Sequence, residues 1–342
     1  MRCAPSTMND LLSVYQHPTL TLLLDDSPSF LDSLAFQLSP HLARKTFHDA
    51  RSALNWLHHA HLHSIKNRKE PIRVGYDEQS ESFERRSASI NLERIYHIVT
   101  ERHRFDMPAV VVVDYAMPQM DGLEFCEAIR RLPCKKILLT GQADEKVAID
   151  AFNRKLIDRF IRKNDTDAMN RLENEIVQLQ EDFFIGQTST LKDLLSRHSY
   201  AFLADPAIVA LAEQLCKRYR FVEYYVFPHP TGILFLDTRG KATLMVIETA
   251  AGLTTQFEVA QDQGAPSELL AALKELRLVP FFSDTGGMYE NAIGHDWTLY
   301  CLPAQVCRGW HDYYWALFDL PHHYLPGPVY SYAEFLQGRT VG

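Results

Sequence analysis

Three carboxylates in this sequence follow apolar runs, and together they could support phosphoryl transfer to an aspartate. Asp114 comes directly after four valines, and Asp25 and Asp26 come directly after the run TLTLLL. Two or three carboxylates held close together repel one another unless a hard cation lies between them, and oxygen ligands with water suit Mg²⁺. Such a cation would bridge Asp114 to an incoming phosphoryl group and offset the charge of that group.

A hydroxyl and an ammonium group stand at comparable points after two further apolar runs. Thr140 ends the run KKILLT and is followed by Gly141, and Lys163 directly follows RFIR. These two side chains would hold the remaining oxygens of the phosphoryl group. Together with the carboxylates, the pattern indicates one phosphoryl-transfer site.

The elements that must position these residues are short strands of a parallel sheet. The valine run before Asp114 is apolar at every position, which is typical of a strand buried on both faces. Helical patterns separate the four runs, and Pro118 and Gly122 shape the loop and the helix start after Asp114. A right-handed parallel sheet brings the carboxyl ends of its strands to one edge. We therefore predict an α/β fold in the N-terminal half.

Residues 19–182 resemble the receiver domain of two-component response regulators. The four segments that carry the resemblance are LLLDDS (22–27), VVDYAMPQMDGLEF (112–125), LLTGQ (138–142) and FIRK (160–163). The resemblance implies a doubly wound (βα)5 parallel sheet. It also implies that a sensor histidine kinase or a phosphotransfer protein donates a phosphoryl group to Asp114, and that the receiver later dephosphorylates itself.

The resemblance gives each residue at the sheet edge a role. The implied Mg²⁺ ligands are Asp25, Asp26, Asp114 and a backbone carbonyl at Ala116. Thr140 is the implied switch hydroxyl, Phe160 the switch aromatic residue, and Lys163 the lysine that holds the phosphoryl group. Asn164 follows that lysine where the family usually has proline. A receiver that folds but is never phosphorylated is the alternative, and the complete residue set argues against it.

The chain is long enough for two domains, since 342 residues is about twice the usual domain size. We expect a flexible tail over 1–17, a receiver domain over 18–183 and an output domain over 184–342. The net charge of −8 disfavours general binding to polyanions. No apolar run is long enough for a membrane span, and the six cysteines lack CxxC spacing, so we expect a cytoplasmic protein with free thiols.

An insertion of about 58–106 separates the second strand of the receiver from the valine run. It is polar, and its histidines include His59 and His63, which lie one helical turn apart and could bind a metal. A solvated extension of a helix is the favoured interpretation, because no cysteine or carboxylate partner lies nearby. We expect a loop over 66–89 and an extra helix over 90–103.

A long helical pattern follows Lys163 and has an apolar seam with alternating spacings of three and four residues. The seam consists of Met169, Leu172, Ile176, Leu179 and Phe183. It predicts a homodimer that forms on phosphorylation. The alternative is that this helix is the last helix of the receiver and packs on its own sheet.

The second half has the pattern of an α+β domain with an antiparallel sheet. An amphipathic helix is expected over 205–220, and a hairpin joins 233–237 to 242–248. Residues 191–342 carry 11 Lys and Arg against 16 Asp and Glu, so a nucleic-acid interface lacks its electrostatic component and no direct DNA binding is expected.

The whole layout also resembles the quorum-sensing response regulators of the Lqs type. This resemblance rests on the order of the domains and on the phrase VVVVDYAMPQMDGLEF. It implies signalling downstream of a membrane sensor kinase, without a standard DNA-binding module. We expect the output domain to act through protein interaction; the alternative is an enzyme or nucleotide-binding module that the receiver regulates.

Overall fold

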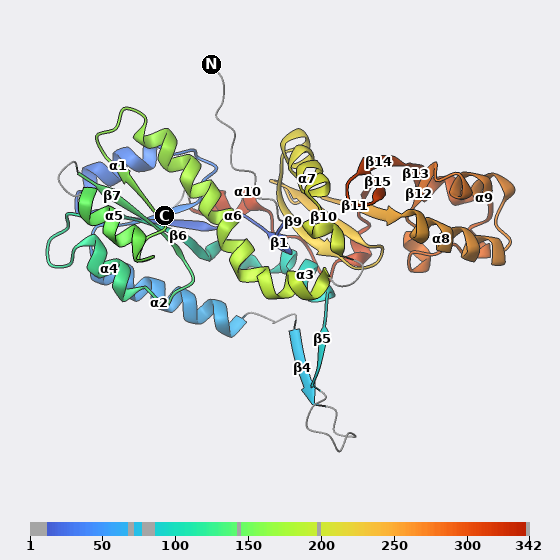
Figure 1. Cartoon of the computed structure of the whole chain (residues 1–342), viewed down its shortest axis with the longest axis horizontal. Coiled ribbons are helices and arrows are strands. Elements are labelled where there is room, and N and C mark those ends of the chain that lie inside the picture. Colours follow the sequence, from blue (N-terminus) through green and yellow to red (C-terminus); the bar gives the residue numbers. More distant parts are fainter. Residues whose placement is uncertain (1–11, 68–71, 77–85, 142–144, 197–199, 340–342) are drawn as a thin grey trace. The chain divides into compact units, whose positions relative to one another are not determined.

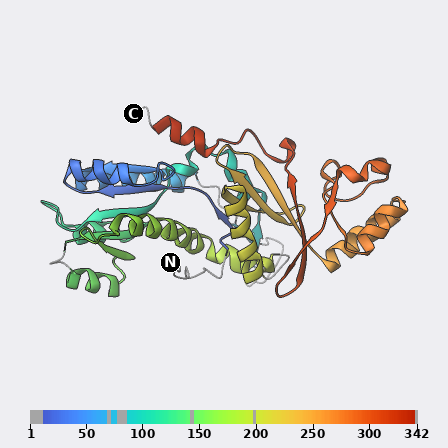
Figure 2. The ribbon, with the colours of Figure 1, turned by 90° about the horizontal axis from the view of Figure 1, so that it is seen from above.

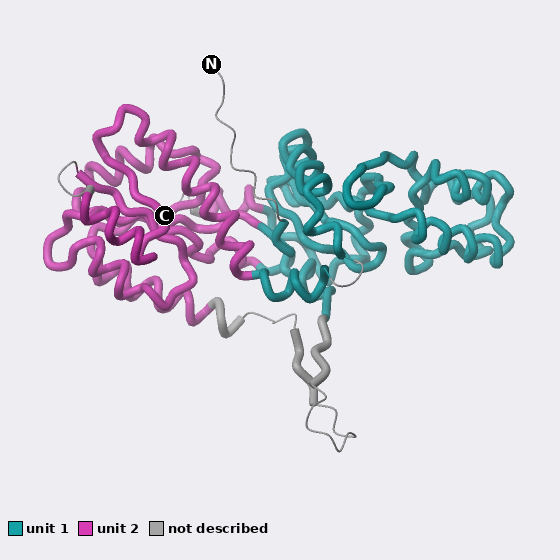
Figure 3. The backbone as a smooth tube through the Cα atoms, in the orientation of Figure 1, with its two compact units in different colours: residues 1–16, 70–101, 188–331 teal, residues 17–69, 102–187, 332–342 magenta. Residues whose placement is uncertain are grey.

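The computed structural model of the chain describes residues 12–67, 72–76, 86–141, 145–196 and 200–339 (Figure 1). The chain divides into two compact units, and each unit is assembled from separate parts of the sequence (Figure 3). Unit 1 contains residues 1–16, 70–101 and 188–331, and unit 2 contains residues 17–69, 102–187 and 332–342.

Unit 2 is built on a five-stranded sheet in which every neighbouring pair of strands is parallel. In spatial order the strands are β3 (Arg44–Phe47), β2 (Leu20–Leu24), β6 (Pro108–Asp114), β7 (Lys135–Thr140) and β8 (Arg159–Arg162). The four valines of β6 are each at most 1% exposed, as expected for a central strand covered on both faces. The predicted doubly wound parallel sheet is confirmed.

Helices cover both faces of this sheet (Figures 1 and 2). They are α1 (Pro28–Gln37), α2 (Ala50–Asn67), α4 (Gly122–Ala128), α5 (Glu145–Asn153) and α6 (Ala168–Leu195). On one face, Leu22, Val111 and Leu138 join a core cluster with buried residues of α2, α4 and α5. On the other face, the Gln180 side chain of α6 donates to the Thr21 hydroxyl of β2 at 3.4 Å.

The seam of helix α6 is buried within the chain, and this corrects the predicted dimer interface. Leu172, Ile176, Leu179 and Phe183 are each at most 3% exposed, and Met169 is half-buried. The polar neighbours of the seam hold the helix against its own unit, because Glu175 accepts from Arg159 at 2.7 Å. The apolar spacing therefore reflects packing of the last receiver helix on its own sheet, which was the alternative interpretation.

Unit 1 contains a six-stranded antiparallel sheet with helices, which confirms the predicted α+β character. In spatial order its strands are β1 (Tyr15–Gln16), β9 (Phe221–Phe227), β10 (Gly232–Asp237), β11 (Ala242–Thr249), β15 (Asp312–Asp319) and β14 (Gln305–Arg308). Its longer helices are α7 (Pro206–Tyr219), α8 (Ala250–Asp262) and α9 (Ser267–Lys274). Helix α7 begins as expected, since the Asp205 side chain accepts from the Ala207 N–H at 3.0 Å.

Several smaller elements complete the chain. Strand β12 (Leu278–Pro280) pairs with β13 (Cys301–Pro303) in a two-stranded sheet. The 3₁₀-helices are η1 (His97–Thr100), η2 (Arg102–Asp106), η4 (Ala201–Ala204), η5 (Ser283–Thr285), η6 (Asn291–Leu299) and η7 (His322–Tyr324). None of the helices in the described part of the chain is long and apolar enough to cross a membrane.

The segment expected as an insertion does not form one loop and one helix. Its first part extends α2 to Asn67, and β4 (Ile72–Tyr76) then pairs with β5 (Arg86–Ile90) in an antiparallel hairpin. In place of a helix over 90–103, the chain forms the short helix α3 (Glu93–Tyr96) followed by η1 and η2. Residues 68–71 and 77–85 of the expected loop lie outside the described residues.

The two units also differ from the expected domain boundaries. Residues 15 and 16 of the expected tail form β1, which pairs with β9 of unit 1. The expected boundary at residue 183 falls inside α6, which continues unbroken to Leu195. The C-terminal helix α10 (Tyr332–Arg339) belongs to unit 2, where the Tyr332 hydroxyl donates to the His41 carbonyl at 2.7 Å. Its ring also lies against Phe105, with the centroids 5.1 Å apart.

Because Ile176 is buried in its own unit, we expect Ile176→Ala to destabilise the chain rather than change its oligomeric state. Removing a fully buried isoleucine side chain costs about 2–4 kcal/mol of unfolding free energy. Val177 is the matched control, since it is the next residue on the same helix and is 46% exposed. Urea titration of both variants tests this, and an equally small effect from Ile176→Ala and Val177→Ala would contradict the buried seam.

Candidate functional site

The parallel register brings the chemistry-bearing residues of unit 2 to one edge of the sheet. Leu24 of β2 lies beside Val113 of β6, so Asp25 and Asp114 follow at the same level. Asp114 in turn lies beside Leu139, the residue before Thr140. Lys163 comes directly after β8, and its backbone N–H donates to the Thr140 carbonyl at 3.0 Å. The residues predicted from four separate runs therefore meet in one place.

The three carboxylates form a cluster that fits a hard divalent cation. Each of Asp25, Asp26 and Asp114 offers an oxygen, and these oxygens lie within 4.8 Å of one another. Asp25 and Asp114 are buried, whereas Asp26 is exposed. An all-oxygen donor set with one side open to water is the arrangement that suits Mg²⁺. Among the described residues this is the only group of three or more potential metal ligands that close.

Lys163 links the two buried carboxylates. Its Nζ lies 2.6 Å from Asp25 Oδ2 and 2.9 Å from Asp114 Oδ1. The same Nζ lies 4.3 Å from the centroid of the Phe30 ring on α1, so an aromatic face limits the positions open to the ammonium group. One ammonium group cannot balance three ionised carboxylates, and the excess negative charge favours a cation at this edge.

Burial and ion pairing act in opposite directions on the ionisation of this site. Burial raises the pKa of Asp114 above its ordinary value, although the hydrogen bond and the charge of Lys163 oppose that rise. Burial alone would lower the pKa of Lys163, but its hydrogen bonds to Asp25 and Asp114 outweigh this effect and raise it. The lysine is therefore held as a cation beside the carboxylate that would be the nucleophile.

The Thr140 hydroxyl is a buried polar group that lacks a hydrogen-bond partner among the described residues. Its side chain is fully buried at the end of β7, and its Oγ1 has no acceptor or donor within reach there. A buried hydroxyl without a hydrogen-bond partner costs free energy, and this one lies at the carboxylate edge of the sheet. Phe160, the expected switch aromatic residue, is half-buried and packs against the core cluster.

The loop after Asp114 is fixed by a tight backbone contact and a helix cap. The Gly122 N–H donates to the Tyr115 carbonyl at 3.0 Å, and a Cβ at Gly122 would collide with the Asp114 carbonyl oxygen. Asp121 caps α4 in a capping box with Glu124. The backbone N–H of Ala116 donates to the Asp114 carboxylate, so the residue expected to offer a carbonyl ligand also contacts the nucleophile through its amide.

The sequence did not identify two contributors to this site. Phe30 lies under the lysine ammonium group, and the Ser27 N–H donates to Asp25 Oδ1 at 2.9 Å. The phenylalanine carries no motif of its own, because an aromatic residue on an amphipathic helix is most often part of a core. Ser27 belongs to the segment LLLDDS. Its backbone hydrogen bond to Asp25 depends on the conformation of the loop after β2, which the sequence pattern does not indicate.

The histidines of α2 do not form a comparable metal centre. His59 and His63 are both exposed, and the His63 ring lies against His103, with ring centroids 5.3 Å apart. His103 also contacts Asp106 at 3.1 Å. In the described part of the chain these residues do not gather three ligand atoms.

Comparison with known proteins identifies similarity to response regulators by sequence and by structure. The response regulator receiver domain family matches residues 80–177, which include Asp114, Thr140 and Lys163. The structure of the response regulator LqsR from Legionella pneumophila is similar to this chain, with 30% sequence identity and a TM-score of 0.74, and covers 95% of both chains. A search of the curated proteins found no match.

Two further solved structures align with about half of this chain. An adenylate cyclase from Rhodopirellula baltica has 20% identity and a TM-score of 0.33, with 53% of this chain and 99% of that chain covered. A response regulator receiver domain protein from Clostridium thermocellum has 19% identity and a TM-score of 0.29, with 47% and 98% covered.

Gly122→Ala should disturb the loop that carries Asp114. A Cβ there meets the Asp114 carbonyl and lies 2.9 Å from Leu138 Cδ1, so the backbone must shift. We expect a loss of about 1–3 kcal/mol in unfolding free energy and weaker Mg²⁺ binding. Gly186→Ala is the control, because a Cβ on that helical glycine meets nothing within 4 Å. Thermal melting and metal titration measure both effects; a Gly122→Ala chain that matches Gly186→Ala would contradict the tight contact.

Proposed function

This chain belongs to the response regulator family, and from that premise we propose that its Asp114 carboxylate accepts a phosphoryl group from a histidine kinase or a phosphotransfer protein. The receiver domain is that of a two-component system, and such a domain works with a phosphodonor protein of this kind. The observation that carries the proposal is the convergence at one sheet edge of three carboxylates, a bridging lysine and a buried hydroxyl that has no partner among the described residues.

The proposed transfer is a displacement at phosphorus. A carboxylate oxygen of Asp114 forms a bond to the phosphorus, and the bond between that phosphorus and the donor imidazole nitrogen breaks. The leaving nitrogen takes up a proton, and Asp114 becomes an acyl phosphate. Burial favours attack by Asp114, because fewer water molecules hydrogen-bond to its carboxylate and must be displaced before the bond to phosphorus forms.

Several residues of this chain would stabilise the negative charge of the phosphoryl group. Asp25, Asp26 and Asp114 would hold Mg²⁺, with the Ala116 carbonyl as a further ligand. Mg²⁺, when bound, supplies positive charge against the phosphoryl oxygens. Lys163 already lies 2.9 Å from Asp114 and would donate to a phosphoryl oxygen added to that residue. The Thr140 hydroxyl would donate a hydrogen bond to another phosphoryl oxygen.

The same contacts provide the proposed switch. Movement of the Thr140 side chain toward the phosphoryl group would satisfy its hydroxyl and vacate space beside β7. Phe160, which is half-buried on the neighbouring strand β8, would turn into that space. The phosphorylated and free states would then present different surfaces, and a bias of a few kcal/mol is enough to exchange their populations.

We propose that the receiver controls an output domain that acts through protein interaction in the cytoplasm. The five cysteines that the structure describes are all free, which supports a reducing compartment. The identity of 30% to LqsR across 95% of both chains supports the same layout and, by extension, a role in quorum-sensing signalling of the Lqs type. Because the seam of α6 is buried, a dimer formed on phosphorylation would use other surfaces of the chain.

Asp114→Asn should abolish phosphorylation of the full chain by acetyl phosphate. The amide preserves the shape of the side chain and removes the nucleophilic oxygen charge. Asp150→Asn is the control, because Asp150 lies on α5 with a 67% exposed side chain. Gel retardation of the phosphorylated form measures the effect, and a hydroxylamine-sensitive phosphate retained in Asp114→Asn would overturn the assignment.

Asp26→Asn should weaken Mg²⁺ binding at least about tenfold while leaving the fold intact, since Asp26 is exposed. Asp32→Asn on α1 is the matched control, an exposed carboxylate outside the cluster. Isothermal titration with Mg²⁺ gives both affinities. Equal affinities in the two variants would show that the cluster does not bind the cation.

Thr140→Val should stabilise the unphosphorylated chain by about 1 kcal/mol, because it removes a buried hydroxyl that has no partner among the described residues. The same variant should gain less thermal stability than the wild type when beryllofluoride and Mg²⁺ are added. Thr140→Ser, which keeps the hydroxyl, should retain that gain. A Thr140→Val chain with the full beryllofluoride response would exclude Thr140 from the phosphoryl contacts.

A further inference from the structure

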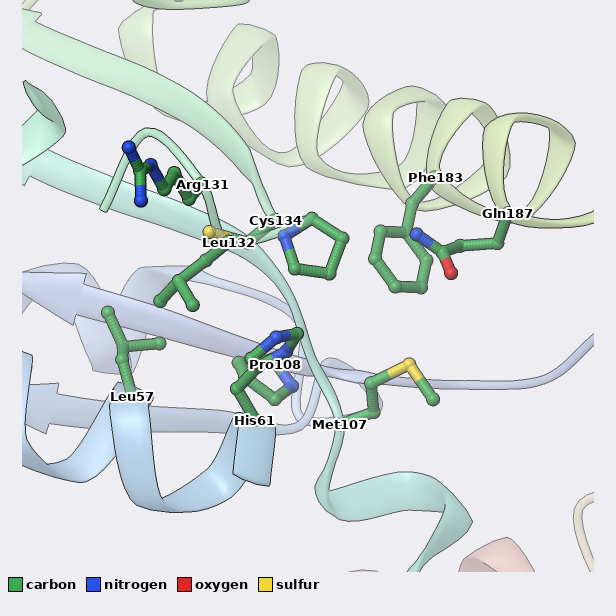
Figure 4. A pocket seen from close by; sticks show the side chains of 10 residues that line it. Leu57, His61, Met107, Pro108, Arg131, Leu132, Cys134, Phe183 and Gln187 are labelled. Atoms are coloured by element: carbon green, nitrogen blue, oxygen red, sulfur yellow. The ribbon is translucent and has the colours of Figure 1, made fainter. Parts of the chain in front are cut away.

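Unit 2 has a pocket at the edge of the sheet opposite to the carboxylate cluster. Its walls come from α2, from the start of β6, from the loop before β7 and from α6 (Figure 4). Pro108 begins β6 and Asp114 ends it, so the pocket lies about 20 Å from the phosphoacceptor along that strand. The cavity volume is approximately 260 Å³, which suits a molecule the size of one aromatic ring with a short side arm.

The interior of the pocket is mainly apolar. Leu57 of α2, Pro108 and Leu132 line it from three elements, and the ring of Phe183 points into it from α6 (Figure 4). Leu57 and Phe183 are themselves buried, so these walls are set by the core rather than by mobile surface side chains. Displacement of water from these walls by the apolar part of a ligand would favour binding in proportion to the apolar area that it covered.

The polar groups at the pocket differ in charge. His61 and Gln187 are uncharged donors or acceptors on opposite walls; burial, followed by the nearby His58, lowers the pKa of His61 and keeps its ring neutral near pH 7. Arg131 is exposed and borders the pocket, and it has no carboxylate partner among the described residues. Its neighbour Arg130, by contrast, pairs with Glu127 at 3.0 Å.

We propose that this pocket binds a small organic carboxylate, with its apolar body between Leu57, Leu132 and Phe183 and its carboxylate at the solvent border beside Arg131. A carboxylate buried among the apolar walls would lose its hydration and gain no hydrogen bond or ion pair in exchange. At the border it stays hydrated and lies beside the Arg131 guanidinium group, which has no carboxylate partner among the described residues. The uncharged ring of His61 would orient the ligand by a hydrogen bond.

The position of this site gives the receiver a second input, separate from phosphorylation. A ligand in the pocket touches α2, the loop before β7 and α6 at once. Phe183 and Gln187 lie one turn apart on α6, so occupancy would stabilise the packing of that helix on unit 2. The site does not use Asp114 or the carboxylate cluster.

The test uses the full chain with 3-phenylpropanoate and its uncharged analogue 3-phenylpropanamide as probes. Methyl resonances of ¹³C-methionine-labelled protein report binding, because Met107 lines the pocket and can be assigned through Met107→Leu. We expect a saturable shift of the Met107 methyl with the carboxylate and weaker binding of the amide. Arg131→Gln should weaken carboxylate binding about fivefold at low salt and leave amide binding unchanged.

Arg130→Gln is the matched control and should bind both probes as the wild type does, since Arg130 is already paired with Glu127. Leu132→Trp should fill the cavity and abolish binding, while Asp114→Asn should leave it intact. Retained response to beryllofluoride shows that the Leu132→Trp chain is folded. Absence of a saturable Met107 shift, equal binding of both probes, or equal effects of the two arginine substitutions would overturn the proposal.

Discussion

The charge imbalance at the carboxyl edge of the parallel sheet is the constraint on which unit 2 depends. Two buried carboxylates and one exposed carboxylate share a single ammonium group, which lies 2.6 Å and 2.9 Å from the buried pair. Such an arrangement is stable only where strands bring the groups together rigidly and where water or a cation can reach the open side. The apolar strands β2 and β6 meet the first requirement, and exposure of Asp26 meets the second.

The same constraint explains several local features of the fold. Gly122 is needed where the chain passes close to the Asp114 carbonyl, and the Asp121 capping box fixes the start of the next helix. Lys163 is held from three sides, by Asp25, Asp114 and the ring of Phe30. The Thr140 hydroxyl is buried at the same edge and has no hydrogen-bond partner among the described residues, so it is free to accept the switch role proposed for it.

The sequence predicted the receiver well because its signals are local and repeated. An apolar run that stops at a carboxylate identifies both a buried strand and the residue at its end, so the convergence of Asp25 and Asp114 at one edge of the sheet could be inferred. The seam of α6 misled the prediction of a dimer, because spacings of three and four residues describe equally a helix that packs on its own sheet. Only the burial of Ile176 and Leu179 within the chain separates the two. The placement of Tyr332 in unit 2 depends on contacts almost three hundred residues apart and leaves no local pattern.

The central claim is that Asp114, rather than another carboxylate of the cluster, carries the phosphoryl group. Reduction of the phosphorylated chain with borohydride converts an aspartyl phosphate to homoserine, and peptide mass spectrometry then locates the modified residue directly. The measurement needs no substitution and therefore leaves the charge of the site intact. We predict homoserine at position 114 alone, in a reaction that requires Mg²⁺. Homoserine at Asp25 or Asp26, or none in a chain that has taken up phosphate, would contradict the assignment.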